Sequence, residues 1–378
     1  MKNVYEDNRI VMTLDAGGTN LVFSALQLGK EIISPIILPS YSENLEKCLK
    51  TIIEGFQKVK ESLQPEIPVA ISFAFPGPAD YSNGIIGDLP NFPSFKDGIA
   101  LGPMLEEIFE IPTLINNDGD LFAYGEAVAG FLPRINKALK EHGVERVYKN
   151  LLGITLGTGF GAGLVVNNQI CQGDNSAAGE LWLTRNFLKN DVIAEESISI
   201  RAILRVYAEE SRDYTATTPK DIYEIAKGIK EGDSKAAICA FEHMAVVLGE
   251  ALANAITLID GPIVIGGGIS GAAEFIIPKA VEHLKSVIYD IEGNKYSRII
   301  PEIFDLDNPE SFSAFVKDDE NYVKVPFSSK KALYNREKRI AIGVTHLGTS
   351  EAIWLGAYAL ALDYLDNKTN QYASTSVK

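Results

Sequence analysis

Three clusters of glycine residues stand where this sequence could bind a phosphorylated ligand. They occupy residues 15–20 (DAGGTN), 157–163 (GTGFGAG) and 266–268 (GGG). Each follows an apolar run that predicts a β-strand, and glycine lets backbone N–H groups come close to an anion. One cluster alone is more often a plain turn, whereas three at strand ends point to a nucleotide. The P-loop pattern GxxxxGK[ST] does not occur, and 157–161 is followed by a strand pattern rather than a helix, which argues against a dinucleotide fingerprint.

The first cluster combines an acidic residue with groups that can hold phosphate. A hairpin with Gly17, Gly18 and Thr19 at its tip offers backbone amides and a hydroxyl to phosphate oxygens. Asp15 would repel phosphate directly, but its carboxylate could hold Mg²⁺ through water. The structural alternative is a turn aspartate that accepts hydrogen bonds from local amides.

Asp118 is the residue best suited to take a proton. It ends the segment Asn116–Asp118, which closes one predicted strand and precedes a predicted helix, so a helix N-cap is the plain structural interpretation. The functional interpretation is a general base, because phosphoryl transfer to a hydroxyl needs one carboxylate to accept the proton. Glu180 and Glu195 could hydrogen-bond sugar hydroxyls, although each alone is typical of a surface glutamate.

The elements that must position these residues follow from hydrophobic periodicity. A strand, a glycine turn and a second strand are predicted at residues 10–26, and the same arrangement returns about 140 residues later, at 151–166. Two such hairpins indicate a duplicated domain in which each half supplies one glycine turn. The other predicted elements are a third antiparallel strand at 32–38, strands at 69–75, 113–115 and 263–265, and helices at 45–63 (capped by Ser42 or Asn44), 104–109, 121–131, 234–259 and 349–365.

Length and composition set the size and class of the protein. The chain has 378 residues, 46% of them apolar and 22% charged, which predicts a globular protein with two domains. The formal net charge of −15 repels nucleic acid and anionic lipid at long range. Three dispersed cysteines form no metal or disulfide pattern, and neither a secretory signal nor an uninterrupted apolar stretch of about 18 residues occurs. We therefore expect a cytoplasmic enzyme with no nucleic-acid partner and no membrane segment.

Taken together, these segments resemble the ROK family of sugar kinases and repressors, in the actin-like ATPase superfamily. The resemblance runs from about Val11 to Leu362. Its motifs, in order along the chain, are DAGGTN at 15–20, PGP at 76–78 with PN at 90–91, ND at 117–118 with GE at 125–126, LGTGFGAG at 156–163, GEL at 179–181, IVIGGGIS at 263–270, and LGT at 347–349 with LGAY at 355–358. Each motif is short, but together, in order and at sensible spacing, they are specific.

The resemblance implies an α/β fold of two actin-like (ribonuclease H-like) domains, each a mixed sheet flanked by helices. We expect a smaller domain at residues 1–115 with a returning helix at 352–366, a larger domain at 116–351, and a frayed tail at 367–378. The resemblance also implies ATP and Mg²⁺ as cofactors, a sugar substrate and a homodimer. By resemblance Asp118 is the catalytic base; Gly77, Asn91, Asn117, Glu180 and Glu195 line the sugar site; Asp15 (with Mg²⁺, through water), Gly17, Gly18, Thr19, Asn20, Thr158 and Gly159 serve the phosphates; and Gly267 and Gly268 serve the adenine side.

The sequence departs from the family pattern on the sugar side. The family's GELGH motif becomes GELWL, so Leu183 replaces a histidine that contacts the sugar and ligates zinc in many members. No cysteine lies between Glu180 and Ile203, so we expect no structural zinc site and a loop stabilised by packing instead. Asp120 stands where the family often has a second asparagine, and Asp118 remains the better base because it directly follows Asn117.

Phosphorylation of glucose to glucose 6-phosphate is the leading hypothesis, because the C-terminal segment resembles that of glucokinase-like members. A kinase for fructose, mannose or an N-acetylhexosamine is the alternative within the same enzyme class. A sugar-responsive repressor is disfavoured, since about ten residues precede the first hairpin, too few for a helix-turn-helix. An inactive sugar sensor is disfavoured by the intact Asp15, Asp118 and glycine clusters. The acidic segment 291–329 is predicted to be a surface elaboration.

Overall fold

Two compact units make up the protein in the computed structural model, which describes residues 3–77, 79–87, 92–317 and 320–375. The first unit comprises Met1–Ala129, Asn168–Ala178 and Ser350–Lys378, and the second comprises Gly130–Asn167 and Gly179–Thr349. The first unit is therefore assembled from three separate stretches of chain. The predicted two-domain α/β organisation is confirmed.

The first unit is built on a mixed β-sheet. Its strands are β1 (Val11–Ala16), β2 (Asn20–Gln27), β3 (Lys30–Glu31), β4 (Ile36–Pro39), β5 (Ala70–Ala74) and β8 (Thr113–Asn116); the short strands β6 (Ala79–Asp80), β7 (Ile85–Ile86) and β11 (Gln169–Ile170) also belong to this unit. The order in the sheet is β3-β2-β1-β5-β8, with β4 paired to β2. β1 and β2 are antiparallel, with Ala16 opposite Leu21, whereas β5 and β8 run parallel to β1. The predicted glycine hairpin is thereby confirmed.

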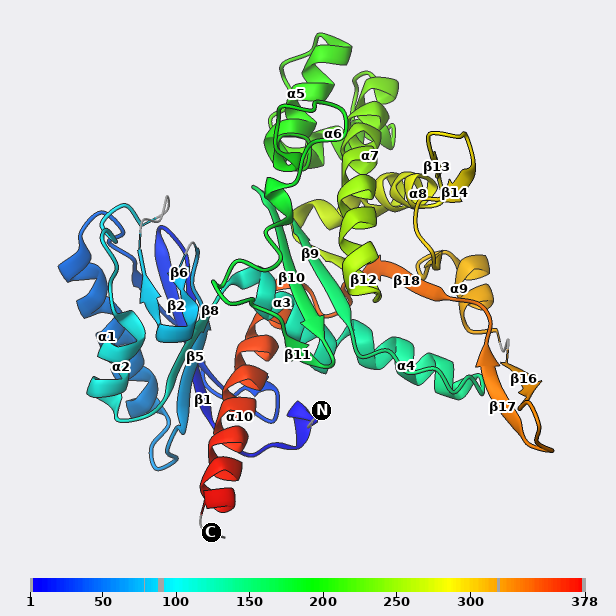
Figure 1. Cartoon of the computed structure of the whole chain (residues 1–378). Coiled ribbons are helices and arrows are strands. Elements are labelled where there is room, and N and C mark those ends of the chain that lie inside the picture. The colour runs from blue at the N-terminus through cyan, green and yellow to red at the C-terminus, as the bar shows by residue number, and fades with distance from the viewer. Residues whose placement is uncertain (1–2, 78, 88–91, 318–319, 376–378) are drawn as a thin grey trace. The chain divides into compact units, whose positions relative to one another are not determined.

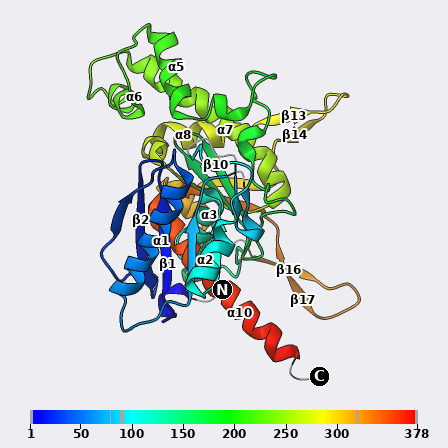
Figure 2. The ribbon, with the colours of Figure 1, turned by 90° about the vertical axis from the view of Figure 1, so that its left-hand side faces the viewer.

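Helices cover both faces of this sheet. They are α1 (Leu45–Ser62), α2 (Leu101–Phe109), α3 (Asp118–Val128) and α10 (Thr349–Thr375). All of α10 after its first residue belongs to the first unit. Figure 1 shows α1 and α2 on one face and α10 on the other, and Figure 2 looks onto the face that α1 and α2 cover. Asn44 rather than Ser42 is the N-cap of α1, since its side chain accepts a hydrogen bond from Lys47 N at 3.0 Å.

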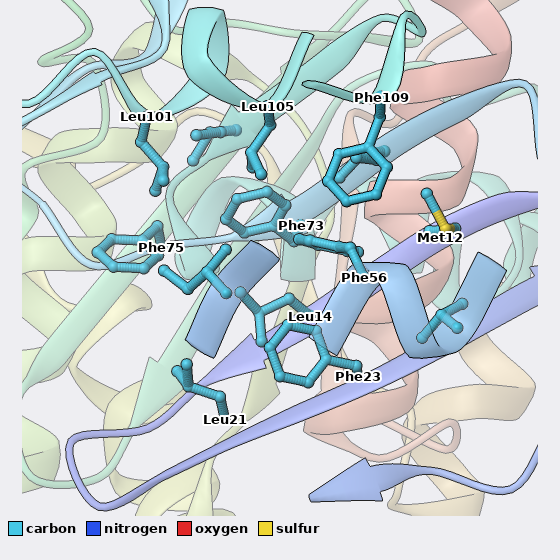
Figure 3. Packing of buried hydrophobic residues seen from close by; sticks show 14 of the residues in the cluster. Met12, Leu14, Leu21, Phe23, Phe56, Phe73, Phe75, Leu101, Leu105 and Phe109 are labelled. Carbon is cyan, nitrogen blue, oxygen red and sulfur yellow. The ribbon is translucent and has the colours of Figure 1, made fainter. Parts of the chain in front are cut away.

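Phenylalanine, leucine and methionine side chains fill the space between the sheet and the helices α1 and α2 (Figure 3). Phe56 of α1 lies among them: its ring meets that of Phe23 edge-on with centroids 5.2 Å apart, and it also contacts Phe73. A Cβ at Gly55 would overlap the Phe23 ring, so glycine is needed there for the helix to approach the sheet. Cys48, on the same face of α1, is fully buried, and burial raises the pKa of its thiol to about 11. Cys48 therefore behaves as a small apolar core residue with an unreactive thiol.

The second unit repeats this arrangement of strands. Its sheet contains β9 (Leu151–Leu156), β10 (Phe160–Val166), β12 (Ile263–Gly266), β15 (Glu302–Asp305) and β18 (Arg339–Val344), in the order β10-β9-β12-β18-β15. β9 and β10 are antiparallel, and β12, β18 and β15 run parallel to β9. An antiparallel hairpin followed by parallel strands thus occurs in both units, as expected of a duplicated domain.

A long helix, α7 (Ser234–Ile259), lies at the centre of the helical part of the second unit. It packs against α5 (Ile200–Ser211), α6 (Pro219–Ala226) and α8 (Ala273–Leu284), while α4 (Phe131–Glu141) and α9 (Pro309–Phe315) complete the set (Figure 1). By length and composition α7 could cross a membrane, alone among the helices in the described ranges. However, 67% of its apolar stretch is buried inside the protein, as in the core helix of a globular domain.

The acidic segment 291–329 is more than the predicted surface elaboration. It contains β14 (Lys295–Ser297), β15, α9 and β16 (Glu320–Lys324), of which β14 pairs with β13 (Val287–Tyr289) and β16 with β17 (Lys331–Asn335). β15 joins the central sheet, where Ile303 is fully buried and Phe304 packs against Phe315 of α9. The prediction was wrong for β15, because four residues, two of them acidic, give too little periodicity to reveal a buried strand.

The boundaries of the units differ from those expected at residues 115 and 352–366. α3 belongs to the first unit because it packs closely against α10: a Cβ at Gly125 would overlap the backbone of Ala352, and a Cβ at Gly356 would overlap that of Leu121. The stretch expected to fray from residue 367 instead continues α10 as far as Thr375. Residues 376–378 of that stretch lie outside the described part of the chain.

Candidate functional site

The turn between β1 and β2 presents backbone amides to solvent. Gly17 N donates to Asn20 O at 3.0 Å, and a Cβ at Gly17 would lie 2.9 Å from the same oxygen, so the turn requires glycine there. Ser40 anchors the exposed tip, because its N donates to Thr19 O at 3.0 Å and its Oγ donates to Gly18 O. Within the described chain the N–H groups of Gly18 and Thr19 have no hydrogen-bond acceptor. Such outward amides suit an anion.

Asp15 and Asp118 line one cavity of the first unit, which has a volume of about 120 Å³. Asp15 lies near the end of β1, and Asp118 is the first residue of α3, two residues after the end of β8. The other lining residues are Leu14, Ala16, Ala74, Phe75, Pro76, Ser350, Ile353 and Trp354. The carboxyl ends of parallel strands therefore bring together the two carboxylates singled out from the sequence.

Asn117 and Asp118 form the N-terminus of α3. Asn117 is the N-cap: its Oδ1 accepts from Gly119 N at 2.7 Å, and its Nδ2 donates to Tyr81 Oη at 3.5 Å. Gly77 lies beside this pair, since a Cβ there would be 2.7 Å from Tyr81 Oη and 3.6 Å from Asn117 Nδ2. Asp118 Oδ1 also accepts from Gly119 N, at 2.9 Å. The capping role thus falls to Asn117, and Asp118 Oδ2 has no hydrogen bond to another described residue.

Both carboxyl groups bind a proton more tightly than an ordinary aspartate. Desolvation by the surrounding protein raises the pKa of Asp118; hydrogen bonds from the amides of Gly119 and of Asp118 itself oppose this rise, and the charge of Asp15 adds to it. Desolvation likewise raises the pKa of Asp15. Each side chain is nevertheless exposed. The carboxylates are therefore crowded by protein yet open to a ligand, which is typical of acid–base groups.

Asp120, the second carboxylate at this helix end, has a different environment. Its side chain is 6% exposed, and it is not among the residues that line the cavity of Asp15 and Asp118. Asp118 is therefore the more accessible of the two. Asn91, expected on the sugar side, lies outside the described residues.

The turn between β9 and β10 is held by an acidic side chain from elsewhere in the second unit. Glu195 Oε2 accepts a hydrogen bond from Phe160 N at 3.0 Å, and Glu195 Oε1 accepts one from Arg201 at 3.0 Å. A Cβ at Gly159 would lie 2.5 Å from Glu195 Oε2. Thr158, at the tip of the turn, is exposed. Glu195, whose carboxylate is expected to bind sugar, thus contacts the second glycine hairpin at Gly159 and Phe160.

Glu180 lies on the surface of the second unit. Its carboxylate accepts a hydrogen bond from Trp182 Nε1. Gly179 before it has a φ of 85° and packs against β10, which requires glycine at this position. Leu183, in the position of the family's histidine, is 54% exposed. Glu180 therefore offers carboxylate oxygens at the surface, whereas Leu183 offers only apolar contact.

Asn186 organises the loop that follows Glu180, although nothing in the sequence marks it for this role. It is fully buried; its Nδ2 donates to Ser197 Oγ at 2.8 Å, and its Oδ1 accepts from Leu188 N at 3.0 Å and Lys189 N at 3.2 Å. Ser197 Oγ in turn lies 3.2 Å from His243 Nε2 of α7. The loop expected to rely on packing is therefore also stabilised by hydrogen bonds around one buried amide.

The third glycine cluster contains two glycines with different surroundings. Gly267 has a φ of 88°, its N donates to Thr349 Oγ1 at 2.7 Å, and a Cβ there would overlap the backbone of Leu156 at the end of β9. At Gly268, by contrast, no described atom lies within 4 Å of the position that a Cβ would take. Packing requires Gly267, whereas Gly268 leaves space for a ligand beside β12.

A larger cavity of the first unit, with a volume of about 660 Å³, contains none of the site residues expected from the sequence. Its lining includes Tyr81, Tyr124 and Tyr364 together with the carboxylates of Glu106 and Asp363. The smaller cavity differs from it, because it is lined by two exposed carboxylates whose pKa values are raised.

Comparisons with known proteins agree with this fold. A crystal structure of glucokinase from Parabacteroides distasonis superimposes with a TM-score of 0.89 at 53% sequence identity, covering 96% of this chain and 99% of that one. A glucokinase from Halalkalibacterium halodurans is 28% identical over 309 residues, which are 74% of this chain and 86% of the relative. An N-acetyl-D-glucosamine kinase from Photobacterium profundum is 29% identical over 294 residues, which are 72% of this chain and 89% of the relative.

The family assignment rests on a match to a sequence model of a whole protein family. The sequence model of the ROK family matches residues 11–309, which contain both glycine hairpins, Asp118 and the third glycine cluster. The resemblance inferred from the short motifs is confirmed: this chain belongs to the ROK family.

Proposed function

We propose that this chain is an ATP-dependent sugar kinase that transfers the γ-phosphoryl group of ATP to a hydroxyl of a hexose, with glucose as the first substrate. Membership of the ROK family and similarity to proteins named glucokinase support this reaction class. The observation that carries the proposal is the exposed Asp118 carboxylate, which shares a cavity with Asp15 and binds its proton more tightly than usual.

Asp118 acts as the general base in this proposal. The attacking hydroxyl must lose its proton during transfer, and a carboxylate within hydrogen-bond reach accepts it. The first turn of α3 stabilises the negative charge that Asp118 carries before the transfer. The raised pKa increases the affinity of Asp118 for the proton it receives. Asn117, fixed as the N-cap, offers its Nδ2 to a sugar oxygen beside the base.

Nucleotide phosphates and Mg²⁺ fit the groups around the first hairpin. The amides of Gly18 and Thr19 point to no acceptor among the described residues and can bind phosphate oxygens. No group of three His, Cys, Asp or Glu side chains suited to a metal occurs in the described residues. Mg²⁺ in a phosphate site needs only one or two carboxylates, because waters and phosphates supply the rest, and Asp15 can hold it through water. When bound, Mg²⁺ neutralises charge on the transferring phosphoryl group.

The choice of sugar is supported by the relatives and by the polar side chains expected to bind the sugar. The 53% sequence identity to a glucokinase favours glucose. The N-acetyl-D-glucosamine kinases among the relatives make an N-acetylhexosamine the first alternative, ahead of fructose and mannose. By resemblance, the side chains of Asn117, Glu180 and Glu195 and the backbone at Gly77 would contribute to sugar binding. Leu183 cannot donate a hydrogen bond where the family's histidine does, so sugar affinity would rest on the carboxylates.

A coupled assay of ADP release over a panel of sugars tests the proposal. We expect glucose to stimulate ADP release most, and the Asp118→Asn variant to lose that stimulation while still binding nucleotide. Absence of stimulation by every hexose and N-acetylhexosamine would refute the kinase function. Stimulation by N-acetylglucosamine alone would keep the kinase function and reject glucose.

We further propose, from the family resemblance, that the active protein is a homodimer in the cytoplasm. Size-exclusion chromatography with light scattering measures the mass of the particle, against 41.2 kDa for one chain. A particle of one chain's mass that remains active would reject the dimer.

A further inference from the structure

Glu195 joins two segments of the second unit into one hydrogen-bonded assembly. Its carboxylate accepts from Phe160 N of the hairpin at 3.0 Å and from Arg201 of α5 at 3.0 Å. A second bond connects the same segments, from Ile200 N to Gly157 O at 3.0 Å. The segment that carries Glu195 is therefore tied to the second glycine hairpin by two hydrogen bonds.

The charge of this carboxylate matters because the hairpin is expected to serve the phosphates of ATP. A bare carboxylate beside a phosphate site repels the ligand, whereas an arginine bound to it offsets the charge. The Glu195 side chain is 21% exposed and that of Arg201 is 50% exposed, so water screens their attraction only in part. Arg201 also donates to Glu196 at 2.6 Å, which restricts its position further.

We propose that Arg201 is a positioning residue that holds the Glu195 carboxylate against the second glycine hairpin and thereby couples sugar binding to nucleotide binding. This inference rests on the proposed kinase function, in which Glu195 meets a sugar hydroxyl. A carboxylate has about four lone-pair sites, so Glu195 accepts a sugar hydroxyl without releasing Phe160 N. The bound sugar fixes Glu195, Glu195 fixes the hairpin, and the nucleotide then binds a hairpin that is already ordered.

Arg205 provides a matched control for Arg201. It lies on the same helix, one turn further along, and donates to the Glu196 carbonyl oxygen at 2.7 Å rather than to Glu195. Arg201→Ala and Arg205→Ala therefore remove the same side chain from α5, but only the first releases Glu195. Arg201→Lys keeps the positive charge and loses the forked geometry of the guanidinium group.

The test measures binding of β,γ-imido ATP with Mg²⁺ by calorimetry, with and without saturating glucose, alongside KM for ATP and kcat. In the wild type and in Arg205→Ala we expect glucose to tighten nucleotide binding. Arg201→Ala should bind the analogue roughly fivefold more weakly without sugar and should lose the effect of glucose. KM for ATP should rise more than kcat falls, and Arg201→Lys should recover part of the affinity.

Two outcomes would overturn the role of Arg201. One is an equal loss of nucleotide affinity in Arg201→Ala and Arg205→Ala, and the other is a lower thermal midpoint or kcat in Arg201→Ala with unchanged nucleotide affinity and coupling. Failure of the proposed kinase function appears differently, as wild-type protein that releases no ADP with any sugar. In that case the nucleotide affinities of wild type and Arg201→Ala, measured without sugar, still decide whether Arg201 supports nucleotide binding.

Discussion

The two glycine hairpins share their strand geometry and differ in the acidic side chain near each turn. In the first unit, Asp15 belongs to the hairpin itself, and its carboxylate lines a cavity with Asp118. In the second unit, Glu195 comes from a separate segment and accepts a hydrogen bond from the hairpin, at Phe160 N. The first unit thus keeps its acidic groups open to a ligand, whereas the second uses one to hold the turn.

The glycines of the two turns differ in the same way. A side chain at Gly17 would meet the backbone oxygen of Asn20, whereas one at Gly159 would meet the carboxylate of Glu195. The first turn therefore needs glycine because of a backbone contact, whereas the second needs it because of a side-chain contact. We infer that the second hairpin, unlike the first, can respond to what Glu195 binds.

Asp118→Asn should have the largest effect on turnover, because it removes the carboxylate proposed to accept the hydroxyl proton. We expect turnover to fall about 10³-fold, since an amide cannot accept the hydroxyl proton. Nucleotide affinity should change by less than about twofold, since Asp118 acts on the hydroxyl. Steady-state ADP release gives the turnover, and calorimetry with β,γ-imido ATP gives the affinity.

Glu195→Gln is the matched variant for the second hairpin. The glutamine oxygen can still accept from Phe160 N, but the side chain no longer carries the charge that pairs with Arg201. Its effect should therefore appear in the KM values for ATP and sugar more than in turnover. A thousandfold loss of turnover in this variant as well would abolish the division of roles between the two units.

Gly125→Ala tests how the first unit holds the helix that carries Asp118. The new Cβ would overlap the backbone of Ala352, so α3 and α10 must move apart. We expect the unfolding free energy to fall by about 2 kcal/mol. Overpacking destabilises the protein, and the better helix propensity of alanine offsets only part of that loss. Urea unfolding measures it. Gly271→Ala, where no described atom lies within 4 Å of the Cβ position, serves as control, and equal losses would refute the close-packing argument.

Gly159→Ala tests the side-chain contact of the second hairpin, with a smaller expected effect. Its Cβ would force Glu195 away from Phe160 N and remove one hydrogen bond, so we expect a loss of about 1 kcal/mol. At Gly157, two residues earlier in the same turn, no described atom lies within 4 Å of a Cβ. Gly157→Ala should therefore leave the thermal midpoint nearly unchanged, and a midpoint as low as that of Gly159→Ala would contradict this account.

The smallest effect we predict is a pH dependence of stability at Asp118. Its pKa in the folded protein is raised above the ordinary 3.8, so the folded state binds this proton more readily than the unfolded chain does. Protonated Asp118 therefore stabilises the folded state below pH 3.8. This contribution is lost as the pH rises through the raised pKa of Asp118 in the folded protein. At neutral pH, Asp118→Asn should therefore raise the thermal midpoint, and the gain should shrink as pH falls. The opposite trend would show that the charged carboxylate is stabilised.

Periodicity was sufficient to predict most regular elements. The helix Ser234–Ile259 has the predicted bounds, and both hairpins lie where apolar runs flank glycine. The predicted helix at 121–131 instead begins at Asp118, because Asn117 caps it and polar residues in its first turn hide its start. Asp15 and Asp118 line the same cavity because each lies near the carboxyl end of a strand, and parallel strands end at the same edge of a sheet.

The contacts that support the site could not be predicted, because they join residues far apart in the sequence. Phe160 and Glu195 are 35 residues apart, and Gly267 and Thr349 are 82 apart. Periodicity reports which face of an element is buried and says nothing of such pairs. Asn186 is a similar case, since a lone polar residue in a loop becomes a structural centre only once neighbouring segments bury it.

The packing of α3 on α10 has a consequence for the order in which the protein is made. Domains fold as their chain leaves the ribosome, from the N-terminal side onward. All of the second unit precedes Ser350, so it can fold while α10 is still being synthesised. The helix that carries Asp118 acquires its packing partner only afterwards, when Ala352 and Gly356 emerge. The proposed base Asp118 therefore gains this packing contact only after the whole second unit has been synthesised.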